Sequence, residues 1–175
     1  MQVGSTFFRL RPVSFVLSSG YHYLAFDVVG DLAFGSPFGM LKAAKDVAPV
    51  ARSQDDAMTT YGDEGAKVDI EYFPAVQLLS ERDDCITSMG VLPAWARTLL
   101  KVCHPWYRKG SVASGHLNGL AIAAIGQRLK TPTDRVDILS KLLQGKDDEG
   151  KPIGRLELTA EVLTQLAAGS DPVSK

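Results

Sequence analysis

The sequence has few of the residues that would mark a secreted, nucleic-acid-binding or membrane-spanning protein. Its two cysteines, Cys85 and Cys103, form no CxxC motif and indicate a reduced, intracellular setting rather than a disulfide framework. The net charge of -1 and the lack of a Lys/Arg cluster argue against a nucleic-acid partner. No apolar run is long enough to cross a bilayer. The N-terminal apolar patch is a poor signal peptide because Arg9, Arg11 and Pro12 interrupt it.

Short catalytic and metal-binding motifs are also missing. The three histidines, His22, His104 and His116, do not pair at the spacing of helical zinc ligands. Cys103 and His104 are adjacent, so on a helix their side chains point in different directions, and we expect both to be structural. The sequence contains no G-x-S-x-G, H-E-x-x-H or Walker pattern.

What the sequence does contain is typical of one helical globular domain. Its 175 residues are enough for a single core, and 45% hydrophobic with 22% charged residues is an ordinary composition. The apolar periodicity predicts a mainly α fold of six or seven helices with little strand. Residues 1–20 show no sustained period and stay poorly determined, whereas residues 21–175 form the predicted domain.

The stretch from Arg155 to Ala168 is the most informative helix of the sequence. It contains no proline or glycine and consists of good helix formers. Apolar residues fall on two faces, so we expect this helix to lie in the middle of the protein. One face carries Leu158, Val162 and Leu166, and the other carries Leu156, Ala160, Leu163 and Ala167.

This helix runs into Ala168-Gly169-Ser170-Asp171, a small-residue segment with an acid beside it. Two interpretations stay open from the residues alone. Gly169 can end the helix as a C-cap, which is the commoner role of a glycine at such a position. Alternatively, the glycine and the carboxylate of Asp171 mark a place where a ligand approaches the helix backbone.

A second helix is predicted over Tyr21 to Gly35. Its apolar stripe carries Leu24, Val28 and Leu32 with the neighbouring Ala25, Val29 and Ala33. Gly30 inside this helix costs on the order of 1 kcal/mol against alanine, so we expect a close helix contact there.

The remaining elements are placed by proline, glycine and periodicity. We expect a partly helical Asp46–Tyr61 interrupted by Pro49, an extended Val68–Phe73, a helix from Ala75 past Cys85, a short helix from Pro93 to Pro105, an amphipathic helix over Val112–Leu129, a helix beginning at Thr131-Pro132-Thr133-Asp134, and a polar connection at Gly145–Gly154.

Several of these stretches together resemble the cytochrome P450 monooxygenases. The resemblance covers about Tyr21 to Asp171, from the E helix to the start of the central I helix of that family, and is strongest to the fungal benzoate para-hydroxylase group. It rests on the order and spacing of YLAFDVVGDLAFGSPFGML, VLPAWARTLL, PWYRKGS, IAAIGQRL, TPTDRVDILSKLLQGKDDEGKPIGR and ELTAEVLTQLAAGSD.

The resemblance implies a haem-thiolate monooxygenase. Ala168-Gly169-Ser170-Asp171 matches the first four positions of the family's A-G-x-D/E-T motif, so Ala168 and Gly169 are implied to face the haem. Gly169 is implied to let oxygen and substrate approach the helix, and Asp171 to relay protons to dioxygen. The implied cofactor is haem iron held by a cysteine thiolate. The implied partners are a small aromatic acid and NADPH-cytochrome P450 reductase, and the implied location is the endoplasmic reticulum membrane.

The sequence also departs from the family pattern. Pro172 stands where the family has the relay threonine, and proline has neither a hydroxyl nor a backbone N–H. The E-x-x-R and F-x-x-G-x-R-x-C-x-G segments are absent, and neither Cys85 nor Cys103 lies in such a context. Residues 1–20 do not resemble the family, and no membrane anchor is present. We therefore expect a fragment without bound haem or activity, cytoplasmic if expressed.

Two other hypotheses remain. The chain can be a non-enzymatic helical remnant that binds a small aromatic ligand with part of an old substrate pocket, formed by Met40 to Leu100. The difficulty is that the helix from Arg155 would then lack part of its cover and expose apolar surface. The other hypothesis is an unrelated helical domain, which composition allows but which does not explain the ordered matches.

Overall fold

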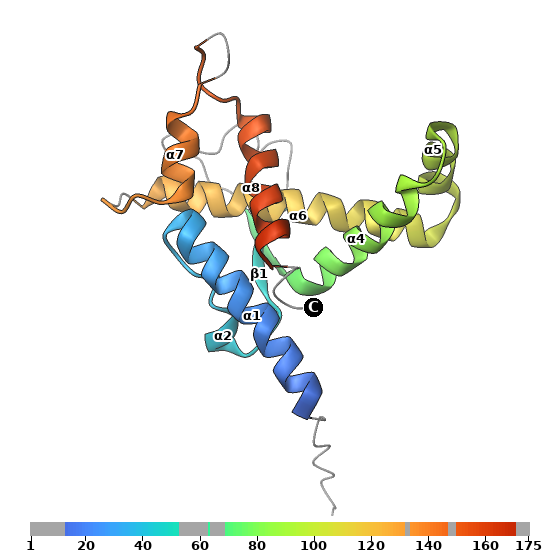
Figure 1. Cartoon of the computed structure of the whole chain (residues 1–175), viewed down its shortest axis with the longest axis horizontal. Coiled ribbons are helices and arrows are strands. Elements are labelled where there is room, and N and C mark those ends of the chain that lie inside the picture. The colour runs from blue at the N-terminus through green and yellow to red at the C-terminus, as the bar shows by residue number, and fades with distance from the viewer. Residues whose placement is uncertain (1–12, 53–62, 64–68, 132–133, 147–149, 171–175) are drawn as a thin grey trace, which may run out of the picture.

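A computed structural model describes residues 13–52, 63, 69–131, 134–146 and 150–170 of the chain. Within these ranges the fold has seven helices and one two-stranded sheet, so the prediction of a mainly α fold is confirmed (Figure 1). The elements in chain order are α1 (Val13–Phe34), α2 (Met40–Ala43), β1 (Ala48–Ala51), β2 (Ile70–Phe73), α4 (Ala75–Gly90), α5 (Ala94–Cys103), α6 (Pro105–Lys130), α7 (Ile138–Gln144) and α8 (Arg155–Ser170).

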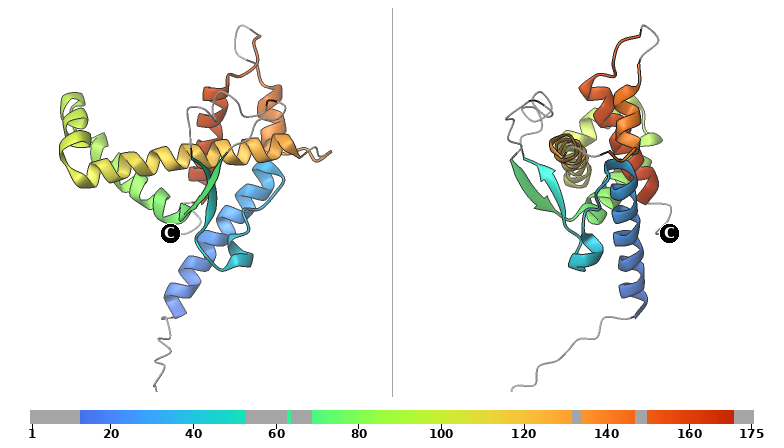
Figure 2. Two further views of the ribbon diagram at one scale, coloured as in Figure 1. Left: turned by 180° about the vertical axis from the view of Figure 1, so that it is seen from behind. Right: turned by 90° about the vertical axis from the view of Figure 1, so that its left-hand side faces the viewer.

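The long helix α6 is the element on which the others pack. Its second half is almost fully buried from Gly119 to Gly126. The hairpin of β1 and β2 lies on one side of α6, and α1 and α8 lie on the other (Figure 2). A Cβ at Gly119 would sit 2.7 Å from the carbonyl oxygen of Ala51, so the missing side chain is what lets β1 lie directly on the helix.

Helix α4 packs against the first half of α6. A Cβ at Gly110 of α6 would meet Cβ of Cys85 at 2.3 Å, so these two helices also approach through a glycine. Helix α4 begins after Pro74, as predicted, but Pro74 has no side chain that could cap it. Asp46 supplies the cap instead: its carboxylate oxygens accept hydrogen bonds from the backbone N–H groups of Val76 at 2.9 Å and Gln77 at 3.1 Å.

Helix α8 is confirmed, but only one of its two apolar faces is fully buried. Leu158, Val162 and Leu166 belong to the core, as the helical spacing predicted. The second apolar face is partly open among the described residues, since Leu156 is 75% exposed and Ala160 is exposed as well. The expectation of burial on both faces is therefore wrong for the first turns of this helix.

Helix α1 presents a different side to the core from the one we expected. Ala25 and Ala33 are buried as predicted, but Leu24, Val28 and Leu32 are exposed. Phe26 and Phe34 take their place in the core. The helix is apolar on nearly all sides, so periodicity alone could not select the side that α6 and α8 cover.

The close contact expected at Gly30 exists, but its partner is not another helix. A Cβ at Gly30 would lie 2.9 Å from the ring of Phe38 and 3.0 Å from the carbonyl oxygen of Ser36. The chain leaving α1 therefore folds back onto its own helix. Phe38 packs edge to face against both Phe26 and Phe34.

Four predicted boundaries are wrong. Helix α1 begins at Val13 rather than at Tyr21. Residues 48–51 form strand β1 rather than helix, pairing with β2 so that Pro49 lies opposite Tyr72. Helix α6 begins at Pro105, not Val112, because His104 caps it and Pro105 suits the first helical turn. Thr131 follows the end of α6 instead of starting a helix; α7 begins at Ile138, where the Asp137 carboxylate accepts the N–H of Ser140 at 2.7 Å. The predicted extended stretch is confirmed over Ile70–Phe73, which form β2, while Val68 lies outside the described residues.

Candidate functional site

The candidate site from the sequence is the C-terminal end of α8, and the structure separates its residues. Ala168 is exposed, Gly169 is half-buried, and Ser170 is buried with its hydroxyl donating to the carbonyl of Leu166. The helix continues through Ser170, so Gly169 lies within α8 and the C-cap interpretation is wrong. Asp171 and Pro172 lie outside the described residues.

Gly169 packs directly on helix α1. A Cβ at this position would lie 2.5 Å from Cγ2 of Val29. Carbon atoms normally approach to about 3.5–4.0 Å, so alanine does not fit here unless one of the helices moves. The lack of a side chain at Gly169 thus serves the packing of α8 on α1, a contact between segments at opposite ends of the chain.

Ala168 lies on the open side of the same helix. One helical turn before it stands Thr164, and one turn before that Glu161, both exposed. Glu161, Thr164 and Ala168 therefore form a row of small or polar side chains that no described residue covers. We call this row the open face of α8.

Neither cysteine lies at this face. Cys85 is buried between α4 and α6, where its thiol donates to the carbonyl of Tyr107 at 3.8 Å. Burial raises the pKa of the Cys85 thiol, an effect that the charge of Lys101 partly offsets. Cys103 is exposed at the end of α5. No group of three His, Cys, Asp or Glu side chains that could hold a metal ion exists within the described ranges.

Two of the histidines have structural contacts, as we predicted for His104. Nδ1 of His104 accepts the N–H of Trp106 at 3.3 Å and caps α6. His116 stacks on the ring of Phe73, with 4.2 Å between ring centroids, and so ties α6 to β2. The geometry therefore supports a helix-capping role for His104 and a packing role for His116.

Sequence reasoning missed three buried or paired aspartates. Asp27 in α1 accepts hydrogen bonds from the N–H groups of Gly39, Met40 and Leu41 at 2.7–3.1 Å, and so fixes the start of α2. Asp31 forms a two-fold ion pair with Arg135, with distances of 2.9 and 2.7 Å. The only signal in the sequence was an acid at these points of an otherwise apolar helix.

The third is Asp137, whose side chain is fully buried and paired with Arg128. Burial alone would raise the pKa of Asp137, but hydrogen bonds from Arg128 and Ser140 and the charge of Arg128 outweigh it and lower the pKa. The carboxylate therefore stays ionised at neutral pH and holds the end of α6 to the start of α7.

No helix in the described ranges is both long and apolar enough to cross a membrane.

Sequence comparisons show which known proteins this chain is similar to. Over 158 residues, 88% of the chain, the sequence is 39% identical to a benzoate 4-monooxygenase of Aspergillus niger. It is 26% identical over 155 residues to a cytochrome P450 monooxygenase of Aspergillus oryzae, and 61% identical over 43 residues to one of Penicillium brasilianum. The chain spans only 28%, 24% and 9% of these relatives. No family model and no solved structure matches it.

The mainly helical fold and these matches support a partial cytochrome P450: the chain is similar to part of the cytochrome P450 monooxygenases named above. Within that family it is similar to the benzoate 4-monooxygenase of Aspergillus niger. The family resemblance read from the sequence strings is thereby confirmed.

Proposed function

We propose that this chain forms part of a haem-thiolate monooxygenase that inserts one oxygen atom into a C–H bond of a small aromatic acid, with electrons from NADPH through a reductase partner. The observation that carries the proposal is the similarity over 88% of the chain to a protein named benzoate 4-monooxygenase. The haem, when bound, supplies the activation of dioxygen, and the protein supplies binding, orientation and exclusion of water.

We propose that the open face of α8 would face the haem if haem were bound. Ala168 adds little bulk to this face, and Thr164 adds a hydroxyl. Gly169 lies on a different side of α8, where its contact with Val29 fixes the distance between α8 and α1. Asp171 is proposed to hold the proton that the reaction consumes, and Pro172 supplies no hydroxyl beside it.

The fit of haem to the described residues is incomplete. The buried thiol of Cys85 has its pKa raised and packs between α4 and α6, and Cys103 lies at the end of α5, so neither is placed on the open face of α8. We therefore propose that this chain by itself neither holds haem through a thiolate nor hydroxylates benzoate.

A chimera tests this proposal. Residues 21–172 of this chain would replace the matching segment of the Aspergillus niger relative, in one version as they stand and in another with Pro172→Thr. We expect both chimeras to give the ferrous carbonyl absorption of a thiolate-ligated haem, and only the threonine version to couple NADPH consumption to benzoate hydroxylation. A thiolate-type spectrum from the 175-residue chain alone, or its absence from both chimeras, would contradict the proposal.

We further propose that the intact protein contacts the endoplasmic reticulum membrane through α5 and the start of α6. Val91–Lys130 contains no Asp or Glu. The side chains exposed around α5 and the first turn of α6 include the apolar Val91, Trp95, Leu99, Val102 and Trp106 and the basic Arg97, Lys101, Arg108 and Lys109. Exposed tryptophan beside basic residues is the combination that binds the interface of an anionic membrane.

The two tryptophans of the chain, Trp95 and Trp106, both lie on this surface, so intrinsic fluorescence reports on it directly. We expect a blue shift with vesicles containing phosphatidylserine, weakened by Val102→Ser and by Lys101→Glu. Leu24→Ser, which changes an exposed leucine of α1, is the matched control and should leave the shift intact. Equal effects of all three variants, or no shift at all, would refute the proposed contact.

A further inference from the structure

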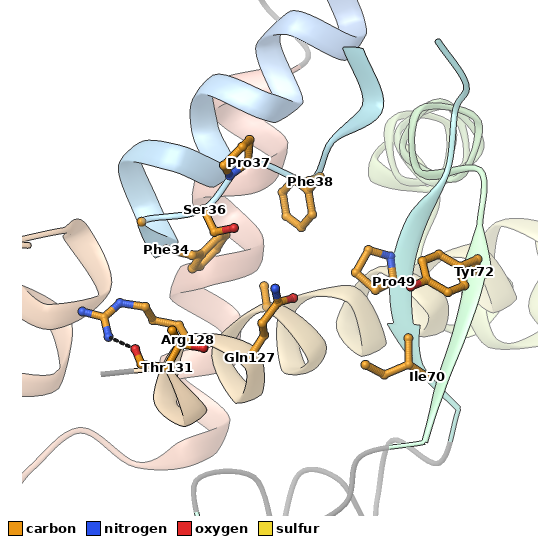
Figure 3. Close-up of a pocket in the computed structure, with 12 residues that line it drawn as sticks. Phe34, Ser36, Pro37, Phe38, Pro49, Ile70, Tyr72, Gln127, Arg128 and Thr131 are labelled. Atoms are coloured by element: carbon orange, nitrogen blue, oxygen red, sulfur yellow. Dashed lines mark hydrogen bonds between the residues drawn. The ribbon is translucent and has the colours of Figure 1, made fainter. Parts of the chain in front are cut away.

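A cavity of about 550 Å³ lies away from the open face of α8. It is open to solvent on one side and is lined by the end of α1, the hairpin and the last turns of α6, and α8 contributes no residue to its wall (Figure 3). Its volume is within the range that small-molecule sites in proteins occupy, roughly 300–1,000 Å³. The lining residues are Phe34, Gly35, Ser36, Pro37, Phe38, Pro49, Ile70, Tyr72, Ala124, Gln127, Arg128 and Thr131.

The apolar part of the wall consists largely of flat rings. Phe34 and Phe38 pack edge to face, with 6.1 Å between their centroids. Pro49 of β1 and Tyr72 of β2 lie across the opening from Phe38 (Figure 3). Tyr72 is 67% exposed, so a large aromatic surface here has no cover among the described residues. A planar aromatic molecule would bury the faces of these rings.

Among the described residues, the wall carries no unpaired charge for such a molecule. Arg128 is the one charged side chain among them that lines the cavity, and its Nε donates to the buried carboxylate of Asp137. Its Nη1 also lies 3.4 Å from the carbonyl oxygen of Thr131. Because the guanidinium is neutralised in this way, a carboxylate entering the cavity would lose its hydration without gaining an unpaired cation.

Gln127 is one of the polar side chains that line the space. Gln127 rises between Phe38 and Pro49 in Figure 3, and it has no hydrogen-bond partner in the part of the chain that the structure describes. Its amide offers both donors and an acceptor. A ligand with an amide or hydroxyl group could pair with both, which an aliphatic hydrocarbon could not.

We propose that this cavity binds an uncharged planar aromatic molecule that carries an amide or hydroxyl group, with its ring between Phe38, Pro49 and Tyr72 and its polar group on Gln127. The site is separate from the oxygen chemistry proposed for α8. It does not depend on the monooxygenase proposal, and it concerns the present chain without any cofactor.

Fluorine NMR of the 175-residue chain tests the proposal with two probes of the same shape. We expect para-fluorobenzamide to bind saturably. Its anionic counterpart, para-fluorobenzoate, should bind at least about fivefold more weakly, because the charge of Arg128 is already paired with the carboxylate of Asp137. Tyr72→Ala and Gln127→Ala should each weaken benzamide binding about three- to tenfold, the size of one lost contact or hydrogen bond. Tyr21→Ala, at an exposed tyrosine of α1, is the control and should bind as the original chain does.

The location is checked independently by the amide NMR spectrum. The side-chain NH₂ resonances of Gln127 should move during the benzamide titration, while backbone amides of α4 stay in place. Circular dichroism would confirm that the variants are folded, which their exposed positions favour. Equal binding of the two probes, unchanged binding by both cavity variants, or resonance changes confined to other helices would overturn the proposal.

Discussion

Replacing Gly169 by alanine tests the contact on which the placement of α8 depends. The added Cβ would lie 2.5 Å from Cγ2, 3.6 Å from Cγ1 and 3.7 Å from Cβ of Val29. Only the first distance is shorter than an ordinary carbon contact, by about 1 Å. Valine in a helix has one strongly preferred rotamer, so Val29 cannot easily turn its methyl group away. The two helices must therefore separate.

The expected change in the free energy of unfolding is the sum of two opposing effects. Forcing an extra methyl group into a packed contact costs about 1–3 kcal/mol. Replacing a helical glycine by alanine stabilises the helix by about 1 kcal/mol. We expect Gly169→Ala to destabilise the fold by about 1 kcal/mol, and the same change in a Val29→Ala background to stabilise it by about 1 kcal/mol. The coupling of about 2 kcal/mol would exceed the scatter of additive mutations, about 0.3–0.5 kcal/mol.

Urea unfolding of the four proteins in this cycle, followed by circular dichroism, measures the coupling. Ala168→Gly is the matched control: Ala168 is exposed, so its loss should cost about 1 kcal/mol in either background. If Gly169→Ala has the same effect with and without Val29, the glycine is not a helix-packing residue. Its role would then have to be sought on the open face.

Three further predictions concern the buried aspartate and glycine contacts. Asp27→Ala should lower the free energy of unfolding by about 2–4 kcal/mol in the urea assay, because three N–H groups at the start of α2 lose their acceptor. The control is Asp84→Ala, at an exposed aspartate of α4, which should change the free energy of unfolding by no more than about 0.5 kcal/mol. Asp137→Asn should lower Tm at neutral pH, and the difference from the original chain should shrink as pH falls below about 4: the native pKa of Asp137 is lowered, so its stabilisation is present above the ordinary carboxyl pKa and is lost as the native carboxylate protonates. A Tm difference that grows on acidification would contradict this sign. Gly110→Ala should destabilise by about 3 kcal/mol, and Cys85→Ala should not rescue it, since the closer of the two contacts is with Cβ of Cys85, at 2.3 Å, rather than with its sulfur, at 2.6 Å.

Local chemistry was enough to place several elements. Pro74 and Pro93 predicted the starts of α4 and α5, because proline suits the position just before or at the first turn of a helix. The spacing of Leu158, Val162 and Leu166 predicted the buried side of α8. These features depend only on neighbours within a few residues, so a sequence is sufficient to read them.

The features that failed depend on partners far away in the chain. The sequence predicts helix at β1 because the pairing of β1 with β2 joins residues that are far apart in the chain, and no local pattern indicates it. Periodicity predicts the wrong buried side of α1 because the packing of α6 and α8 decides which side is covered. The carboxylate of Asp27 gave no hint that its partners lie 12–14 residues further on.

The same distinction between local and distant determinants applies to the candidate site. The sequence by itself determined the helical class, the Ala168-Gly169-Ser170-Asp171 segment and its resemblance to the cytochrome P450 family, because these are properties of local pattern and order. Only the tertiary structure decided that Ala168 faces outward while Gly169 packs on Val29, and that Phe38, Tyr72 and Gln127 line one cavity. The physical reason is that a side chain's role depends on which atoms surround it, and those atoms come from distant segments brought together by burial of the core.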